Sequence, residues 1–218
     1  MTLLEFARGP ALQVSLIVLV LGVVWRLVGL LLLPYKKDLS EARPGRSALG
    51  GAAYTIVRRL WPHREFQHRV LFTYVMGYVF HLGLAVVVFG FIPHILFIRN
   101  LTGLSWPGLP NWAVYLAGSV TIAALVAILV RRLTHDVLRL LSTPDDYFSW
   151  FVTILPLVTG FLTAAHFGAL YQTLLAVHLL TVELLFLWLP FGKLMHAFLF
   201  VFSRGFTGAR AAHKGVQT

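Results

Sequence analysis

The sequence predicts an all-α integral membrane bundle of five transmembrane helices, and three observations support this fold class. The 218 residues are 58% hydrophobic and only 12% charged, whereas soluble proteins carry about 25% charged residues. Five apolar segments are each long enough to cross a hydrocarbon layer of about 30 Å. The basic residues also cluster in alternate connectors. Residues 1–218 are therefore expected to form a single membrane domain.

Each predicted span is a run of about 20 apolar residues that contains few charges. The five spans are expected at residues 11–33, 70–91, 112–130, 147–165 and 170–202. The first is interpreted as a retained helix and not as a signal peptide, because Arg26 interrupts it and no small-residue cleavage site follows. The last is expected to continue beyond residue 189 as an apolar stem.

The positions of Lys and Arg predict the orientation. Fifteen of the 18 lie on one side of the predicted spans, and Arg8 and Arg99 lie on the other. By the positive-inside rule the N-terminus is outside and the C-terminus is cytoplasmic. The net charge of +10 therefore indicates membrane topology and not a nucleic-acid partner. We expect a multi-pass protein of a prokaryotic inner (cytoplasmic) membrane. The basic connector at 34–69 is either a solvated loop or a docking surface for a cytoplasmic subunit.

Histidine is the residue through which this chain would hold a redox metal. The sequence has no cysteine, which excludes a thiolate-held iron–sulfur cluster within the chain. Of nine histidines, His81, His178 and His196 fall within the predicted spans, where ionisable side chains are rare and commonly functional. Imidazole is a usual axial ligand of haem iron.

Topology predicts that His81 and His196 bind one haem. The second span rises from the cytoplasm and the fifth returns to it, so both histidines are expected in the inner half of the membrane. Gly77 and Gly192 each precede one of these histidines by four residues, which places each glycine on its histidine's helical face and leaves room for a flat ring. The eighteen residues from His178 to His196 would make about five helical turns and align these two rings as well.

Two stretches carry a resemblance to a known family. The segments FHLGLAVVVFGFIPH (80–94) and HLLTVELLFLWLPFGKLMH (178–196), with the pair Trp25-Arg26, resemble the cytochrome b (gamma) subunit of respiratory nitrate reductases. The broader family includes membrane subunits of heterodisulfide-reductase-like and sulfite-reductase-associated complexes. The resemblance implies a haem-b subunit that oxidises a quinol, menaquinol or ubiquinol, and passes electrons to a cytoplasmic iron–sulfur subunit. By position, His81 and His196 match the ligands of the inner haem, and His178 matches one ligand of an outer haem.

The sequence departs from that family at the outer haem. The position of its second ligand is Phe91, and the bulky Leu174 precedes His178 by four residues. His94 would replace the missing ligand only if Pro93 bends the helix, since it lies about 220° around the helix from His81; His166 is another candidate. Without a second haem, His178 would instead hydrogen-bond a quinone carbonyl. The departure favours a partner other than a nitrate reductase.

Three other features have two interpretations each. Glu183 would either accept a proton from quinol or bond to a neighbouring helix. Arg26 would either reach the cytoplasmic interface or pair with a haem propionate. The outer loop at 102–112 would either cover a quinone pocket or simply connect two spans. The competing class for the whole chain is a cofactor-free membrane anchor of a multisubunit complex. A small transporter is disfavoured because no internal repeat is evident.

Overall fold

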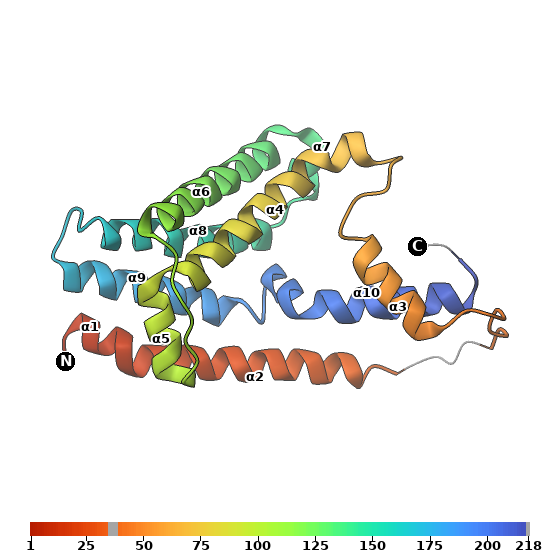
Figure 1. The fold of residues 1–218 in the computed structure, drawn as a ribbon, viewed down its shortest axis with the longest axis horizontal. Helices are drawn as coiled ribbons and strands as arrows, with labels where there is room; N and C mark the ends of the chain where they lie inside the picture. The colour runs from red at the N-terminus through yellow and green to blue at the C-terminus, as the bar shows by residue number, and fades with distance from the viewer. Residues whose placement is uncertain (35–38, 217–218) are drawn as a thin grey trace. The chain divides into compact units, whose positions relative to one another are not determined.

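The computed structural model describes residues 1–34 and 39–216, and all regular structure within them is helical (Figure 1). Five of the described helices are long and apolar enough to cross a membrane: Leu3–Leu31, Gln67–Gly90, Asn111–Thr134, Pro144–Ala164 and Tyr171–Trp188. The predicted all-α fold with five candidate spans is therefore confirmed. Lys36 and Lys37, which entered the orientation argument, lie outside the described residues.

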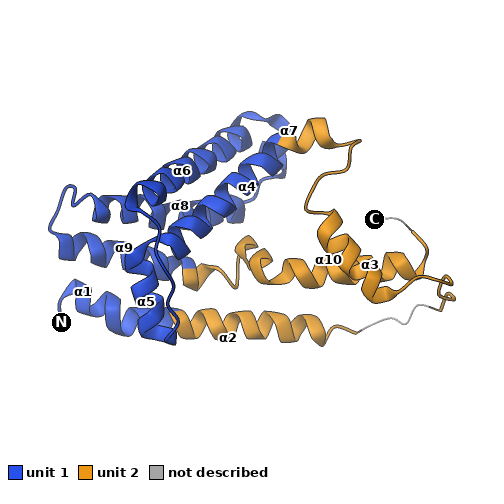
Figure 2. Cartoon of the chain, in the orientation of Figure 1, with its two compact units in different colours: residues 1–15, 72–185 blue, residues 16–71, 186–218 orange. Residues whose placement is uncertain are grey.

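The chain divides into two compact units, coloured separately in Figure 2. Unit 1 contains residues 1–15 and 72–185, and unit 2 contains residues 16–71 and 186–218. The helices α2 (Leu12–Leu31), α4 (Gln67–Gly90) and α9 (Tyr171–Trp188) each contribute to both units. The first span is continuous from Leu3, because the short α1 (Leu3–Phe6) runs through a π-helical turn (Ala7–Ala11) into α2.

In unit 1 small residues bring α4, α6 (Asn111–Thr134) and α8 (Pro144–Ala164) close together. A Cβ at Gly83 of α4 would overlap the Thr121 hydroxyl of α6, and one at Gly118 of α6 would lie 2.6 Å from the Phe161 ring of α8. Small residues are enriched where membrane helices approach closely, since their backbones can then pack together. Leu125, Ile154 and Leu157 form the buried cluster of these helices.

The second predicted span ends in a break at its C-terminal end. Helix α4 stops at Gly90, Phe91 is extended, and α5 (Ile92–Thr102) begins with Pro93 in its first turn. Proline suits a first turn because the N–H that it lacks would have no helical partner there. The carbonyls of Phe89 and Gly90 accept hydrogen bonds from the Trp106 indole (2.6 Å) and the Leu109 amide (2.8 Å). The outer loop is therefore packed against the end of α4.

Helix α8 begins at a charged junction with α6. Thr143 and Asp146 form a capping box, in which the Asp146 carboxylate accepts hydrogen bonds from the Thr143 amide and hydroxyl, both at 2.9 Å. The same carboxylate pairs with Arg132 at 3.1 Å, and its side chain is only 9% exposed. The Asp146 carboxylate thus caps the N-terminus of α8 and neutralises the positive charge of Arg132 at the end of α6.

Asp146→Ala is expected to destabilise the protein by about 2–3 kcal/mol, because it removes a helix cap and leaves a half-buried cation without its partner. The measurement is the thermal unfolding midpoint of the detergent-solubilised protein. Asp136→Ala is the matched control, since Asp136 pairs with Arg139 in an ion pair whose side chains are 91% and 66% exposed. Exposed pairs contribute little, so equal effects of the two substitutions would contradict the assignment.

Unit 2 is built around the contact of α3 (Ala48–Arg58) with α10 (His196–His213). The crossing is made by small residues: a Cβ at Gly51 would overlap Ala212, and one at Gly208 would overlap the Gly51 carbonyl and the Thr55 hydroxyl. Thr55 is fully buried. Within the basic connector, residues 48–58 are therefore a packed helix, and the docking surface for a cytoplasmic subunit stays a prediction.

The expectation of one continuous helix over 170–202 is wrong. Helix α9 ends at Trp188, a turn and a short 3₁₀ segment η2 (Lys193–Met195) follow, and α10 begins at His196. Pro190 lies in the interruption, and proline both lacks a donor and clashes with the preceding helical turn. His178 and His196 are therefore not aligned on one helix.

The steric argument for Gly192 is wrong for the same reason. Gly192 is extended and precedes η2, so it does not lie one helical turn before His196. A Cβ on Gly192 would overlap the indole of Trp188. Gly192 therefore leaves room for the Trp188 indole of the same unit.

Candidate functional site

Within unit 1 the structure brings together His94 of α5 and His178 of α9. Their ring centres are 6.1 Å apart and their planes differ by only 20°. The break after Gly90 makes this approach possible, because α5 no longer follows the rotation of α4. The sequence tied an inward-facing His94 to a bend at Pro93, and the observed change of direction is a full interruption at Phe91.

A backbone carbonyl orients His94. Its Nδ1 lies 2.9 Å from the Val87 carbonyl oxygen in the last turn of α4, and since a carbonyl can only accept, Nδ1 must donate. Burial lowers the pKa of His94, although the bond to Val87 acts in the opposite direction. The ring is therefore neutral at pH 7, and Nε2 carries its basic lone pair.

Hydroxyl groups of two helices orient His178. Its Nδ1 lies 3.3 Å from the Thr159 hydroxyl of α8. That hydroxyl lies 2.8 Å from the Leu155 carbonyl and 2.9 Å from the Thr181 hydroxyl, which itself donates to the His178 carbonyl at 2.7 Å. With the Thr159 proton directed to either of those oxygens, the Thr159 oxygen accepts from Nδ1. The Pro156 carbonyl of α8 also accepts a hydrogen bond from the His178 ring.

A glycine allows the His178 ring to lie against α8. A Cβ at Gly160 would be 3.2 Å from Cε1 and 3.4 Å from Nδ1 of His178, which is tighter than ordinary van der Waals contact. The small residue beside this histidine thus comes from the neighbouring helix, although Leu174 is bulky on its own helix. Sequence reasoning missed Thr159, Gly160 and Thr181; small and hydroxyl-bearing residues inside an apolar span were the available signal.

A series of aromatic contacts leads away from His94. The Phe91 ring meets His94 edge-on at 5.3 Å and lies 6.3 Å from Tyr115, which in turn lies 6.1 Å from Phe161. Phe91 therefore packs against a histidine at the position where the resembled family has a ligand. The Phe91 ring thus packs against one side of the His94 imidazole.

Two other residues named from the sequence also lie in unit 1. His166 follows α8 with a left-handed φ of 53°, and its ring stacks on Tyr171 at 4.9 Å. Of the two suggested partners of His178, the structure thus brings His94 to it. Glu183 is only 3% exposed, and neither carboxyl oxygen has a hydrogen-bond partner among the residues that the structure describes.

The candidate inner ligands belong to different units, His81 to unit 1 and His196 to unit 2. The Nδ1 of His81 lies 2.7 Å from the Gly77 carbonyl, and that of His196 lies 2.8 Å from the Lys193 carbonyl. Each ring is therefore held in the same tautomer as His94. A Cβ at Gly77 would meet no described atom within 4 Å. The pairing of His81 with His196 stays a prediction.

Arg26, named from the sequence as an interfacial or propionate-binding residue, lies in α2 and is exposed. It belongs to unit 2. Its two interpretations both stay predictions.

The donor set restricts the kind of metal that the paired imidazoles could hold. Across residues 1–34 and 39–216, no group of three or more His, Cys, Asp or Glu side chains is placed to bind one ion. A structural zinc site needs four ligands, almost always from the protein. Haem iron takes its remaining ligands from the porphyrin, so one or two histidines suffice. The pair therefore fits axial ligation better than a bare ion.

The helices and their composition define the class: this is a multi-pass α-helical membrane protein. A curated protein of Nitratidesulfovibrio vulgaris (strain Hildenborough) is 34% identical over an alignment of 215 positions that covers 96% of this chain and 93% of that protein. The chain belongs to the family of that protein. The relative's name, "Protein", states no activity. No protein-family model and no solved structure matches the chain.

Proposed function

We propose that the chain is a haem-b membrane subunit that transfers electrons between the quinone pool and a cytoplasmic iron–sulfur partner subunit. The observation that carries the proposal is the pair His94 and His178, with parallel rings 6.1 Å apart. The imidazoles of His94 and His178 would hold the iron of a haem, since imidazole is a usual ligand of haem iron.

The surroundings of the pair support the same assignment. Histidine ligands of metals usually donate their second nitrogen to a carbonyl or another acceptor, which fixes the ring and raises its basicity. His94 has such an acceptor in the Val87 carbonyl, and His178 has one in the Thr159 hydroxyl. The Nδ1 atoms of His81 and His196 likewise lie against backbone carbonyls. His94 and His178 would hold an outer haem, and His81 and His196 an inner one.

The remaining roles follow from the chemistry of quinol oxidation. A bound haem would supply one-electron oxidation and reduction. Oxidation of a quinol to the quinone releases two electrons and two protons. We assign the buried Glu183 carboxylate to accept one proton, and the other proton passes to water. Since the chain has no cysteine, an iron–sulfur cluster that exchanges electrons with it belongs to a partner. Terminal catalysis is then the partner's, as in the nitrate reductase gamma-like subunits, and the location is a prokaryotic cytoplasmic membrane.

The test is the cofactor content of the purified protein, produced in a bacterium that makes haem. We expect a red protein with two haem b per chain, a reduced-minus-oxidised b-type spectrum, and reduction by a menaquinol or ubiquinol analogue. His196→Ala and His81→Ala are each expected to remove the inner haem and to leave membrane insertion intact. A colourless protein would instead support the cofactor-free anchor, and full haem content in His196→Ala would refute the inner ligand assignment.

A further inference from the structure

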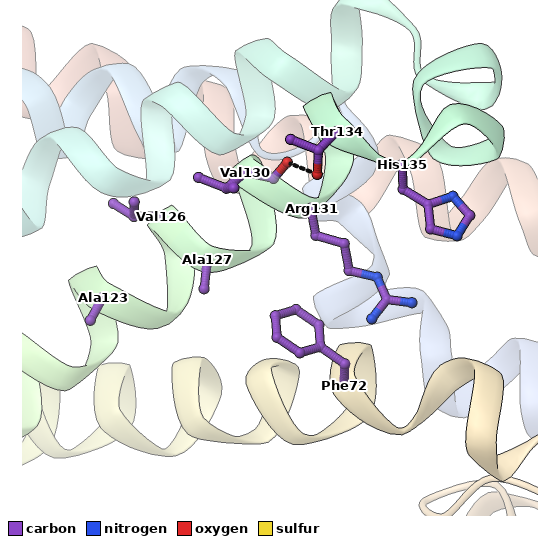
Figure 3. A pocket seen from close by; sticks show the side chains of 8 residues that line it. All are labelled: Phe72, Ala123, Val126, Ala127, Val130, Arg131, Thr134 and His135. Atoms are coloured by element: carbon purple, nitrogen blue, oxygen red, sulfur yellow. Dashed lines mark hydrogen bonds between the residues drawn. The ribbon is translucent and has the colours of Figure 1, made fainter.

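A groove on unit 1 lies between α6 and the N-terminal end of α4, apart from the histidine pair (Figure 3). Its volume is about 880 Å³, and it is a shallow groove open to the surroundings of the helices. The wall from α6 repeats at helical spacing, with small Ala123 and Ala127 beside Val126 and Val130. These four residues therefore form one apolar face of the helix.

One end of the groove is polar and basic, in contrast to its apolar stretch. Arg131, Thr134 and His135 follow the apolar stretch, and Figure 3 shows the Arg131 side chain extending toward Phe72. The guanidinium carbon lies 4.8 Å from the centre of the Phe72 ring, a cation–π contact that holds the cation at the mouth of the groove. Arg131 thus contributes the cationic end of this surface.

The dimensions match one leaflet of a bilayer. Ala123 and Thr134 are eleven residues apart on α6, which at 1.5 Å per residue is about 16 Å. Half of a hydrocarbon core of about 30 Å is about 15 Å. The basic end is the one that the positive-inside rule assigns to the cytoplasm. The apolar stretch would therefore lie beside acyl chains and Arg131 at the level of the headgroups.

We propose that this groove binds an anionic phospholipid of the cytoplasmic leaflet. An acyl chain lies over Ala123 and Ala127, and the headgroup phosphate contacts Arg131 and His135. Basic pockets at the cytoplasmic ends of membrane helices favour anionic headgroups, and arginine binds phosphate through several N–H donors. This site is independent of the proposed haem function and uses none of its residues.

The experiment is native mass spectrometry of the full-length protein in neutral detergent, titrated with dioleoylphosphatidylglycerol or dioleoylphosphatidylcholine. We expect the first lipid to bind about five-fold to ten-fold more tightly. Arg131→Gln should remove most of that preference. The matched control is Arg139→Gln, which removes one exposed positive charge from the next helix, α7 (Asp136–Leu141), and should retain it. Ala127→Phe should weaken binding of both lipids by filling the groove.

Equal binding of the two lipids to the unmodified protein would overturn the proposal. So would equal losses in Arg131→Gln and Arg139→Gln, since they would indicate general attraction of the basic surface. Displacement of the lipid by inorganic phosphate alone, or by an uncharged quinone analogue irrespective of Arg131, would identify a different ligand. If Arg131→Gln does not fold, unchanged lipid binding by Ala127→Phe is sufficient to refute the site.

Discussion

His178→Ala is expected to reduce the haem content from two haem b per chain to one, because His178 is the imidazole that unit 1 brings to His94. His94→Ala should have the same result, because the outer haem would then also lack one of its two histidine ligands. The two variants should also lose quinol oxidation while retaining the inner haem. Pyridine haemochrome absorbance per mole of protein measures the loss, and reduced-minus-oxidised spectra identify the haem that remains.

His166→Ala is the control for these variants. This histidine lies near the same end of the bundle but stacks on Tyr171, so its removal should leave both haems in place. Thr159→Val keeps the His178 ring but removes its hydroxyl partner. Loss of such a supporting group typically weakens metal binding by about 10–100-fold. Two haems per chain in His178→Ala would show that the pair is not an axial pair, whereas loss in His166→Ala would shift the outer site to that residue.

Gly208→Ala is expected to separate α3 from α10 or to destabilise unit 2 by about 2–3 kcal/mol, as overpacking of a close contact does. The new methyl group would overlap the Gly51 carbonyl and the Thr55 side chain. A carbonyl in the middle of a helix cannot rotate away, so the helices themselves must move apart. Hydrogen exchange of the α3 amides, or trypsin cleavage after Arg58, measures the separation.

Gly205→Ala is a matched control on the same helix. Its methyl group would be 3.7 Å from Ile56 and 3.9 Å from Ala52, which is ordinary contact. Since alanine is favoured over glycine in a helix interior by about 1 kcal/mol, this variant should be as stable as the unmodified protein or more stable. Increased exchange of α3 in both variants would contradict a close crossing at Gly208 in particular.

The positions of the spans could be predicted from the sequence, whereas the contacts at the candidate site could not. The five spans were predictable because length and hydropathy are local properties, and the ends of the third and fourth differ from expectation by four residues or fewer. The interruption at Pro190 could also have been predicted from the sequence, because proline disfavours continuation of a helix. It was overlooked because the flanking residues are as apolar as those of a span.

By itself, the sequence determined an apolar five-span helical protein whose redox chemistry, without cysteine, would fall to histidine. Only the tertiary structure decided which ring meets His178. A helix continuing past Gly90 would direct His94 elsewhere, and whether it stops there depends on distant groups. Trp106 and Leu109 supply the donors that the carbonyls of Phe89 and Gly90 need in an apolar environment. Such contacts between residues far apart in the chain are not encoded in the periodicity of any one segment.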